Sequence, residues 1–247
     1  MCGRYANTKV TTDLATLFDA LDEGDDAWSG SFNIAPTTKA PIVRLSKSAG
    51  DRAGASHELG VRVVESARWG LIPPWAKELS IGNRMFNARS ETVQTSKAYR
   101  RPFATRRALI PADGWYEWQK LPSGAKQPYF MTHRDGLTFA GLWESWGSGD
   151  ERVLSFTVLT CPATGGLEDI HDRMPLILPS DTHATWLGEG EADPAELLSG
   201  PPLADILALD VRKVSKSVGN VRNNGPELVE EIEAVEEDVL PPTLPGL

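Results

Sequence analysis

The middle of the chain is a succession of seven short apolar segments, and this pattern constrains the fold more than any other feature of the sequence. The segments are rich in β-branched, aromatic and aliphatic residues, as strands are. They cover 40–45, 61–70, 107–111, 114–120, 128–133, 137–146 and 153–161. Strands that follow one another without regular crossover helices argue against βαβ units. We therefore expect a largely antiparallel sheet or barrel.

Short peripheral helices are expected around this core. An amphipathic helix is predicted over 11–21, and shorter ones over 90–98, 180–187, 194–199 and 226–234. The 247 residues suffice for one domain with a substantial core, and no Gly- and Pro-rich linker divides them. The prediction is a single compact domain over 1–234, followed by a disordered, acidic and Pro-containing tail over 235–247.

The distribution of charge matters more than its sum. With 25 Lys and Arg against 34 Asp and Glu, the net charge is −9, which by itself argues against a nucleic-acid partner. Residues 81–134, however, contain ten basic and three acidic side chains, a local net charge of +7. Either this stretch is a solvated face balanced by acidic segments elsewhere, or it forms an anion-binding surface. The charges alone leave both readings open.

Composition also narrows the cellular setting. No apolar run approaches the ~18 residues of a membrane span, and the N-terminus lacks the apolar region of a signal peptide, so we expect a cytoplasmic protein. The two cysteines, Cys2 and Cys161, are too few for a disulfide framework. The two cysteines and the four scattered histidines form no metal-binding motif, so we expect no metal site. Cys161, on an apolar strand, is expected to be buried and structural.

Cys2 is the first residue with distinctive chemistry. Removal of Met1, which a small following residue permits, would give Cys2 a free α-amine and a thiol on adjacent carbons. An α-amine with a pKa near ~7.7–8.0 is partly neutral at physiological pH and can form a Schiff base with an aldehyde. The thiol can then close a thiazolidine ring. The alternative is that Cys2 is an incidental small residue at a frayed end.

Glu117 lies in the aromatic run Asp113-Gly114-Trp115-Tyr116-Glu117-Trp118. Strand alternation places Trp115 and Glu117 on one face and Tyr116 and Trp118 on the other. A carboxylate among aromatic rings is desolvated, which raises its pKa and suits it to proton transfer near neutral pH. The alternative is an outward-facing strand residue in contact with water.

Two further segments carry polar residues that are suited to a site. His171, between Asp and Arg neighbours and just before an apolar strand, is a candidate acid or base, or else a loop residue without a role. Asn87 and Arg89 offer an amide and a guanidinium just before a predicted helix start, although Asn87 also suits a simple turn, and Ser90 and Glu91 a helix start.

Tryptophan is the commonest aromatic residue, with eight Trp against seven Phe and four Tyr. Trp69 and Trp75 bracket a segment that contains two prolines. Aromatic rings and prolines beside arginines are typical of surfaces that stack the bases of single strands. For most individual Trp residues, a place in the core is the simpler expectation.

Seven short motifs in chain order resemble those of the SRAP family, the SOS-response-associated peptidases. They are Met1-Cys2-Gly3-Arg4-Tyr5, Asn33-Ile34-Ala35-Pro36, Trp69-Gly70-Leu71-Ile72-Pro73, Asn87-Ala88-Arg89-Ser90-Glu91-Thr92, Asp113-Gly114-Trp115-Tyr116-Glu117-Trp118, Ile170-His171-Asp172-Arg173-Met174-Pro175 and Val218-Gly219-Asn220-Val221. Each motif is weakly specific, but seven in register over residues 2 to about 230 are highly specific.

The resemblance implies a single compact α+β domain around an antiparallel, barrel-like β-core, with a basic channel for single-stranded DNA. Members of the family capture abasic sites in DNA damage responses. The sugar aldehyde forms a thiazolidine crosslink with the N-terminal cysteine, and the peptidase label refers to autocatalytic removal of preceding residues. Carried over by motif, Cys2 is the nucleophile and Glu117 shuttles protons. His171 protonates the sugar oxygen as the ring opens, and Asn87 positions the amine.

The same resemblance implies the DNA contacts. Arg4, Arg89 and Arg173 match positions that contact phosphates, and Pro36 and Trp75 match apolar surfaces that pack against flanking bases. Ala76 departs from the pattern, because members often carry a second aromatic residue there, so Trp75 is expected to stack without a second ring beside it. We expect a monomer that uses neither a cofactor nor a metal and associates with the nucleoid when bound to DNA.

Two other functions are compatible with parts of the sequence. Class II glutamine amidotransferases also begin Met-Cys-Gly, but the chain lacks their Arg-Trp-Ala-Thr-like and Asn-Gly-(Asp/Asn) motifs in the first third. A non-catalytic reader of modified DNA would need the basic channel and not Cys2. A Cys2-dependent covalent crosslink to abasic DNA, glutamine hydrolysis, or DNA binding that does not need Cys2 distinguishes the three functions.

Overall fold

The computed structural model describes residues 2–24, 28–52 and 60–232. Within these ranges eleven strands form one sheet, whose main path runs in the order β11-β8-β9-β5-β4-β7-β1-β3. These strands are β11 (Asp210–Lys213), β8 (Lys126–Trp146), β9 (Val153–Pro162), β5 (Val61–Trp69), β4 (Lys39–Ser46), β7 (Arg107–Lys120), β1 (Tyr5–Asn7) and β3 (Ser31–Ile34). Off this path, β10 (Arg173–Pro175) and β6 (Asn87–Arg89) pair with β9, and β2 (Leu21–Asp22) pairs with β5.

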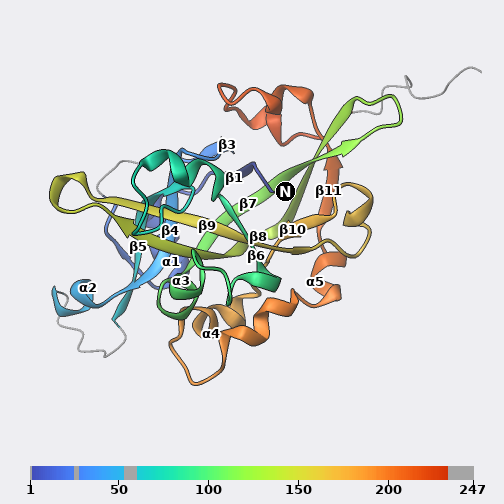
Figure 1. Ribbon diagram of the computed structural model, residues 1–247. Helices are drawn as coiled ribbons and strands as arrows, with labels where there is room; N and C mark the ends of the chain where they lie inside the picture. Colours follow the sequence, from blue (N-terminus) through green and yellow to red (C-terminus); the bar gives the residue numbers. More distant parts are fainter. Residues whose placement is uncertain (1, 25–27, 53–59, 233–247) are drawn as a thin grey trace, which may run out of the picture.

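The sheet closes on itself because β7 pairs with both β4 and β8. Strands β8, β9, β5, β4 and β7 therefore form a ring around the main hydrophobic core (Figure 1). Most pairings are antiparallel, but β5–β9, β6–β9 and β2–β5 are parallel. The predicted α+β class and strand-rich core are confirmed, while the ring is less regular than an antiparallel barrel since its β5–β9 pair is parallel.

The predicted strands are present, but two pairs of them are continuous. The segments 107–111 and 114–120 form the single strand β7, and 128–133 and 137–146 both belong to β8. The register of β7 against β8 shifts between Ala112 and Gly114. A Cβ at Gly114 would collide with the Phe130 ring and the Met131 carbonyl oxygen, so only glycine permits this close approach.

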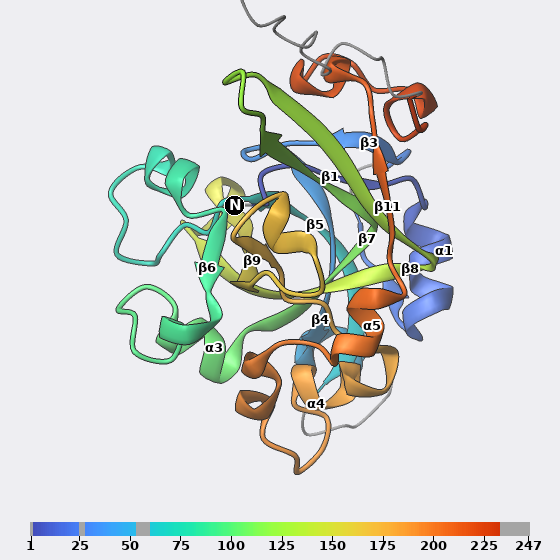
Figure 2. The same cartoon turned by 90° about the vertical axis from the view of Figure 1, so that its right-hand side faces the viewer.

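Short helices lie outside the ring (Figure 2). The α-helices are α1 (Thr11–Phe18), α2 (Lys47–Arg52), α3 (Arg100–Thr105), α4 (His183–Leu187) and α5 (Leu203–Leu207). The 3-10 turns are η1 (Leu79–Arg84), η2 (Ser90–Thr92), η3 (Gly149–Glu151), η4 (Leu167–Asp169), η5 (Ser180–Thr182), η6 (Pro194–Ser199), η7 (Lys216–Gly219) and η8 (Pro226–Leu228). None of the helices in the described chain is long and apolar enough to cross a membrane.

Several helix predictions need correction. The helices predicted over 90–98 and 226–234 are wrong, because 90–98 and the described part of 226–234 contain only the short 3-10 helices η2 and η8. The helix predicted over 194–199 has the predicted bounds, but it is the 3-10 helix η6. The helix predicted over 11–21 ends at Phe18, since Asp19 takes a left-handed conformation and the chain then enters β2. The tail predicted over 235–247 lies outside the described residues.

The two faces of β7 differ as strand alternation predicts. Trp115 packs in the main core, and Glu117 lines a small cavity beside it. Tyr116 packs in a smaller second cluster with Phe130, and Trp118 lies partly buried against that cluster. The strand thus presents the Glu117 carboxylate on the face of the main core, in which Cys2 also packs.

Candidate functional site

Strand β1 brings Cys2 to the site. Tyr5 on β1 is the register partner of Trp115 on β7, and the Tyr116 N–H donates to the Arg4 carbonyl at 3.0 Å. This pairing fixes the first residues of the chain alongside the aromatic part of β7. Cys2 itself is fully buried. Burial raises the pKa of its thiol, and the negative charge of Glu117 raises it further.

Asn87 is positioned by β6 and contacts Cys2 directly. Parallel pairing places Asn87 opposite Val158 on β9. The Asn87 Nδ2 donates to the Cys2 carbonyl at 2.7 Å, and the Tyr99 hydroxyl donates to the Asn87 carbonyl at 3.3 Å. The Asn87 Oδ1 is buried and has no hydrogen-bond partner within the described ranges. The Asn87 amide therefore holds the backbone of Cys2 through its Nδ2, and its Oδ1 can accept a further hydrogen bond.

Glu117 is 4% exposed, so the outward-facing alternative is wrong. Burial raises the pKa of its carboxyl group to about 7, although the positive charge of the amino terminus opposes the rise. A carboxyl group with this pKa exchanges protons readily at physiological pH. The environment predicted from the flanking aromatic residues is confirmed, whereas its catalytic role stays a prediction.

His171 lies close to Glu117, although the two residues are far apart in the chain. Its loop follows η4, and its backbone N–H donates to the Leu167 carbonyl at 3.0 Å. His171 and Glu117 line the same cavity of about 10 Å³, roughly the volume that one water molecule needs. Burial lowers the pKa of His171, and the charge of the amino terminus lowers it further. At neutral pH the imidazole is therefore neutral.

The neutral state fixes the position of the His171 proton. The Arg173 backbone N–H donates to His171 Nδ1 at 3.0 Å, which assigns the proton to Nε2. The Asp172 carboxylate also lies 2.9 Å from Nδ1 and can accept a bond only from a protonated Nδ1. Because Asp172 is 85% exposed and the pKa of His171 is lowered, we assign the neutral form with Nε2 protonated.

Exposed basic side chains lie on the segment of the chain that contains Asn87. Arg84, Arg89, Lys97, Arg100 and Arg101 are exposed, and no ion pair joins any of them to another described residue. The remaining positive charge of the basic segment is partly structural, since Arg106 pairs with Glu144 and Arg107 donates to backbone carbonyls. The exposed members can pair with phosphates without first breaking an ion pair.

Trp75 and Pro36, the two apolar residues predicted to contact bases, differ in their exposure to solvent. Trp75 is 53% exposed, with the Lys97 ammonium 5.7 Å from its ring centre. Pro36 is half-buried. Trp75 therefore offers a ring face next to a cation, an arrangement suited to stacking an unpaired base.

The chain is similar to known proteins over nearly its whole length. The model of the SOS response associated peptidase (SRAP) family matches residues 1–221. The chain is 35% identical over 236 residues to the abasic site processing protein YoqW of Bacillus subtilis, covering 93% of this chain and 99% of YoqW. It is 32% identical over 265 residues to the abasic site processing protein HMCES of Xenopus tropicalis, covering 92% of this chain and 77% of HMCES. The chain belongs to the SRAP family.

The fold comparison is consistent with this membership. A solved protein structure from Bacteroides thetaiotaomicron superposes with a TM-score of 0.76, covering 94% of this chain and 100% of that one. At 19% identity this likeness concerns the fold alone. In the described part of this SRAP protein, no three His, Cys, Asp or Glu side chains are grouped so that they could hold a metal ion.

In this SRAP protein Arg4 is engaged with its own chain. Its Nη1 donates to Asn33 Oδ1 and to the Val218 carbonyl, both at 2.7 Å. Asn33 Nδ2 in turn donates to the carbonyls of Val218, Asn220 and Asn223 at 2.8–3.3 Å. The two side chains tie the loop after β11 to the strands beside Cys2. Sequence reasoning missed this role of Asn33, although the residue lies in one of the seven motifs.

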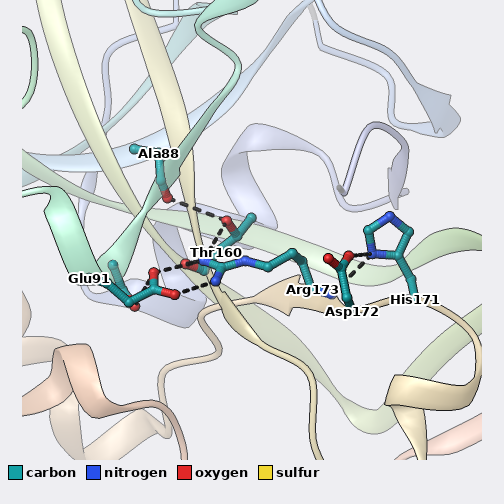
Figure 3. A network of polar contacts seen from close by, with 7 residues as sticks. Ala88, Glu91, Thr160, His171, Asp172 and Arg173 are labelled. Carbon is teal, nitrogen blue, oxygen red and sulfur yellow. Dashed lines mark hydrogen bonds and ion pairs between the residues drawn. The ribbon is translucent and has the colours of Figure 1, made fainter.

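Arg173 is likewise engaged within the SRAP domain. Its guanidinium donates to both carboxylate oxygens of Glu91 and to the Thr160 carbonyl at 2.6 Å (Figure 3). The side chain is only 12% exposed. Glu91 was interpreted from the sequence as a helix-start residue, and nothing in the local pattern indicates an arginine 82 positions away as its partner.

Proposed function

We propose that this SRAP protein captures abasic sites in single-stranded DNA through a covalent thiazolidine bond to Cys2. The observation that carries the proposal is the convergence of four residues from distant parts of the chain. Asn87 binds the backbone of Cys2, Glu117 interacts electrostatically with the Cys2 thiol, and Glu117 and His171 line one small cavity. The names of the relatives, abasic site processing proteins, support the same substrate.

The chemistry begins with the amine rather than the thiol. Once Met1 is removed, the Cys2 nitrogen attacks the aldehyde carbon of the ring-opened sugar, and loss of one water molecule gives an imine. The thiol sulfur then adds to the same carbon, and its proton passes to the imine nitrogen. Because burial keeps the thiol protonated, this second addition needs a base. Glu117, with a pKa of about 7, can accept that proton and deliver it.

His171 and Asn87 have supporting roles in this proposal. With its proton on Nε2, His171 donates to the sugar oxygen as the ring opens. Asn87 holds the Cys2 carbonyl and offers its Oδ1 to the neighbouring amine. An abasic site presents no base edge to recognise, so binding depends on backbone charge and strand flexibility. The exposed arginines and lysines beside the site meet that need.

The decisive experiment mixes the protein with single-stranded DNA that contains one abasic site and resolves the products on a denaturing gel. We expect a covalent band that is lost in Cys2→Ala and absent with intact DNA. Cys161→Ala is the matched control, because it removes the other buried thiol and should leave the crosslink unchanged. Intact mass should show Met1 removed from the reactive protein.

Other outcomes would support the competing functions. Normal crosslinking by Cys2→Ala would exclude Cys2 as the nucleophile. A noncovalent complex that forms equally well with Cys2→Ala, and no covalent band, would indicate a DNA reader. Hydrolysis of glutamine that depends on Cys2 would indicate an amidotransferase-like enzyme.

A further inference from the structure

A buried arginine and an acidic residue connect the two segments that carry Asn87 and His171. Glu91 accepts from Arg173 through both carboxylate oxygens, to Nη1 and, at 2.9 Å, to Nη2 (Figure 3). Parallel bonds between a guanidinium and a carboxylate fix the orientation of both groups as well as their separation. This is therefore a directional link between η2 and β10.

Both ends of the link lie close to site residues along the chain. Glu91 follows Asn87 by four positions, and Arg173 follows His171 by two. The Arg173 backbone N–H also donates to His171 Nδ1. Displacing Arg173 would therefore disturb the hydrogen bond that assigns the His171 proton to Nε2.

The same guanidinium reaches the strand between these segments. Arg173 Nη2 donates to the Thr160 carbonyl at 2.6 Å and lies 3.3 Å from Thr160 Oγ1. Thr160 on β9 is the register partner of Arg89 on β6 and of Pro175 on β10. Three strands thus meet at one residue, and the ion pair joins the two outer strands across it.

The depth of the Arg173 side chain explains why the acid is needed. The Arg173 side chain is 12% exposed, and a cation at that depth requires a compensating charge. Asp172 is its chain neighbour, but at 85% exposure its carboxylate lies in solvent and contacts His171 instead. Glu91 supplies the charge, and its hydrogen bonds to Arg173 lower the pKa of Glu91 to about 2. The link therefore persists throughout the physiological pH range.

We propose that Glu91 is a positioning residue for abasic-site capture, which by holding Arg173 fixes β6 and β10 on the two sides of β9 and so fixes Asn87 and His171 about Cys2. This inference rests on the proposed function. Glu91 touches neither Cys2 nor His171 in this arrangement, and it acts through Arg173. Displacing a reacting group by about 1 Å can cost about 100-fold in rate.

The test separates the rate of capture from DNA affinity. Single-turnover crosslinking is measured against the concentration of an oligonucleotide with one abasic site, giving a maximal rate constant and a half-saturating concentration. For Glu91→Gln we expect the maximal rate constant to fall about 10- to 100-fold, while the half-saturating concentration stays within about twofold. Arg173→Lys, which keeps the charge and loses the paired donors, should lower the maximal rate constant similarly.

Glu65→Gln is the matched control. Glu65 forms a comparable ion pair with Arg44, whose Nε donates to it at 2.9 Å, between β4 and β5. None of the residues that line the Glu117–His171 cavity belongs to this pair. Its loss should reduce stability without changing the maximal rate constant of crosslinking. Thermal denaturation of each variant confirms that the compared proteins are folded.

A charge exchange tests the link itself. The double variant Glu91→Arg, Arg173→Glu should have a higher maximal rate constant than Glu91→Arg alone. An unchanged rate constant in Glu91→Gln, or a raised half-saturating concentration as the sole effect, would overturn the positioning role. If Glu91→Gln does not fold, the maximal rate constant of Arg173→Lys decides alone, because Arg173 is also a predicted phosphate contact, and an unchanged value would overturn the positioning role. Failure of the wild-type protein to crosslink through Cys2 would refute the proposed function instead.

Discussion

Two carboxylates near the site, Glu117 and Glu91, have opposite surroundings. Glu117 lies on β7 at 4% exposure, and burial raises its pKa to about 7. Glu91 has a side chain 45% exposed, and an arginine lowers its pKa to about 2. One group is poised to exchange a proton, whereas the other stays ionised. The difference shows how environment assigns the same side chain to proton transfer or to fixed charge.

The largest expected effect concerns the rate of capture. We expect Glu117→Gln to lower the maximal rate constant of crosslinking by about 10²–10³-fold, because proton transfer by a positioned side chain contributes on this order. The half-saturating DNA concentration should stay within about twofold, since Glu117 is too buried to contact phosphates. Single-turnover crosslinking measures both quantities. A raised half-saturating concentration with an unchanged rate constant would remove the distinction between the two carboxylates.

The same substitution should raise stability at alkaline pH. The folded-state pKa of Glu117 lies above its ordinary value of 4.5, so the folded protein holds a proton that the unfolded chain releases between pH 4.5 and about 7. Wild-type stability falls with rising pH over this interval, by about 3 kcal/mol in total. Glu117→Gln should therefore exceed the wild type by about this amount at pH 8, with the gap closing towards pH 4.5. Urea denaturation at each pH measures the gap, and a gap that is constant with pH would contradict the raised pKa.

A smaller effect of opposite sign is expected for Glu91→Gln. Because the pKa of Glu91 is lowered, its ion pair stabilises the folded state above pH 4.5, and this contribution is lost as the pH falls towards about 2. The partial exposure of the pair limits the contribution to about 1 kcal/mol. The variant should be less stable than the wild type at pH 7 and approach it in acid. Parallel pH slopes for the two variants, in the same urea experiments, would show that both carboxylates titrate alike.

The strands were predictable because their signal is local. Apolar composition located β4, β5, β7, β8 and β9, and alternation along β7 placed Trp115 and Glu117 on the correct face. The continuity of β7 and β8 was not predictable, because the break suggested near Gly114 is a register shift in a long pair. The parallel pairing of β5 with β9 was not predictable either, because the two strands are far apart in the chain and the residues of neither strand indicate its partner.

The 3-10 helices and the ion pair between Glu91 and Arg173 were harder to predict, because both depend on contacts between segments far apart in the chain. The pattern after Ser90 suits a helix start, yet Ser90 is buried and Glu91 is used by Arg173, so tertiary contacts end the turn at Thr92. Resemblance to a family named the nine candidate residues. The resemblance did not indicate that Arg4 donates a hydrogen bond to Asn33, or that Arg173 donates to Glu91. Contact of these arginines with DNA phosphates stays a prediction.

The antiparallel pair of β7 and β8 has a practical consequence for anyone who wishes to label or immobilise the protein. Its connecting turn, with Gly124 in open space, projects from the body of the molecule at a distance from the N-terminus (Figures 1 and 2). A fusion partner ahead of Cys2 would block the amine on which the proposed chemistry depends. A fluorophore or affinity tag inserted between Pro122 and Gly124 would leave that end of the chain unencumbered and report binding by anisotropy.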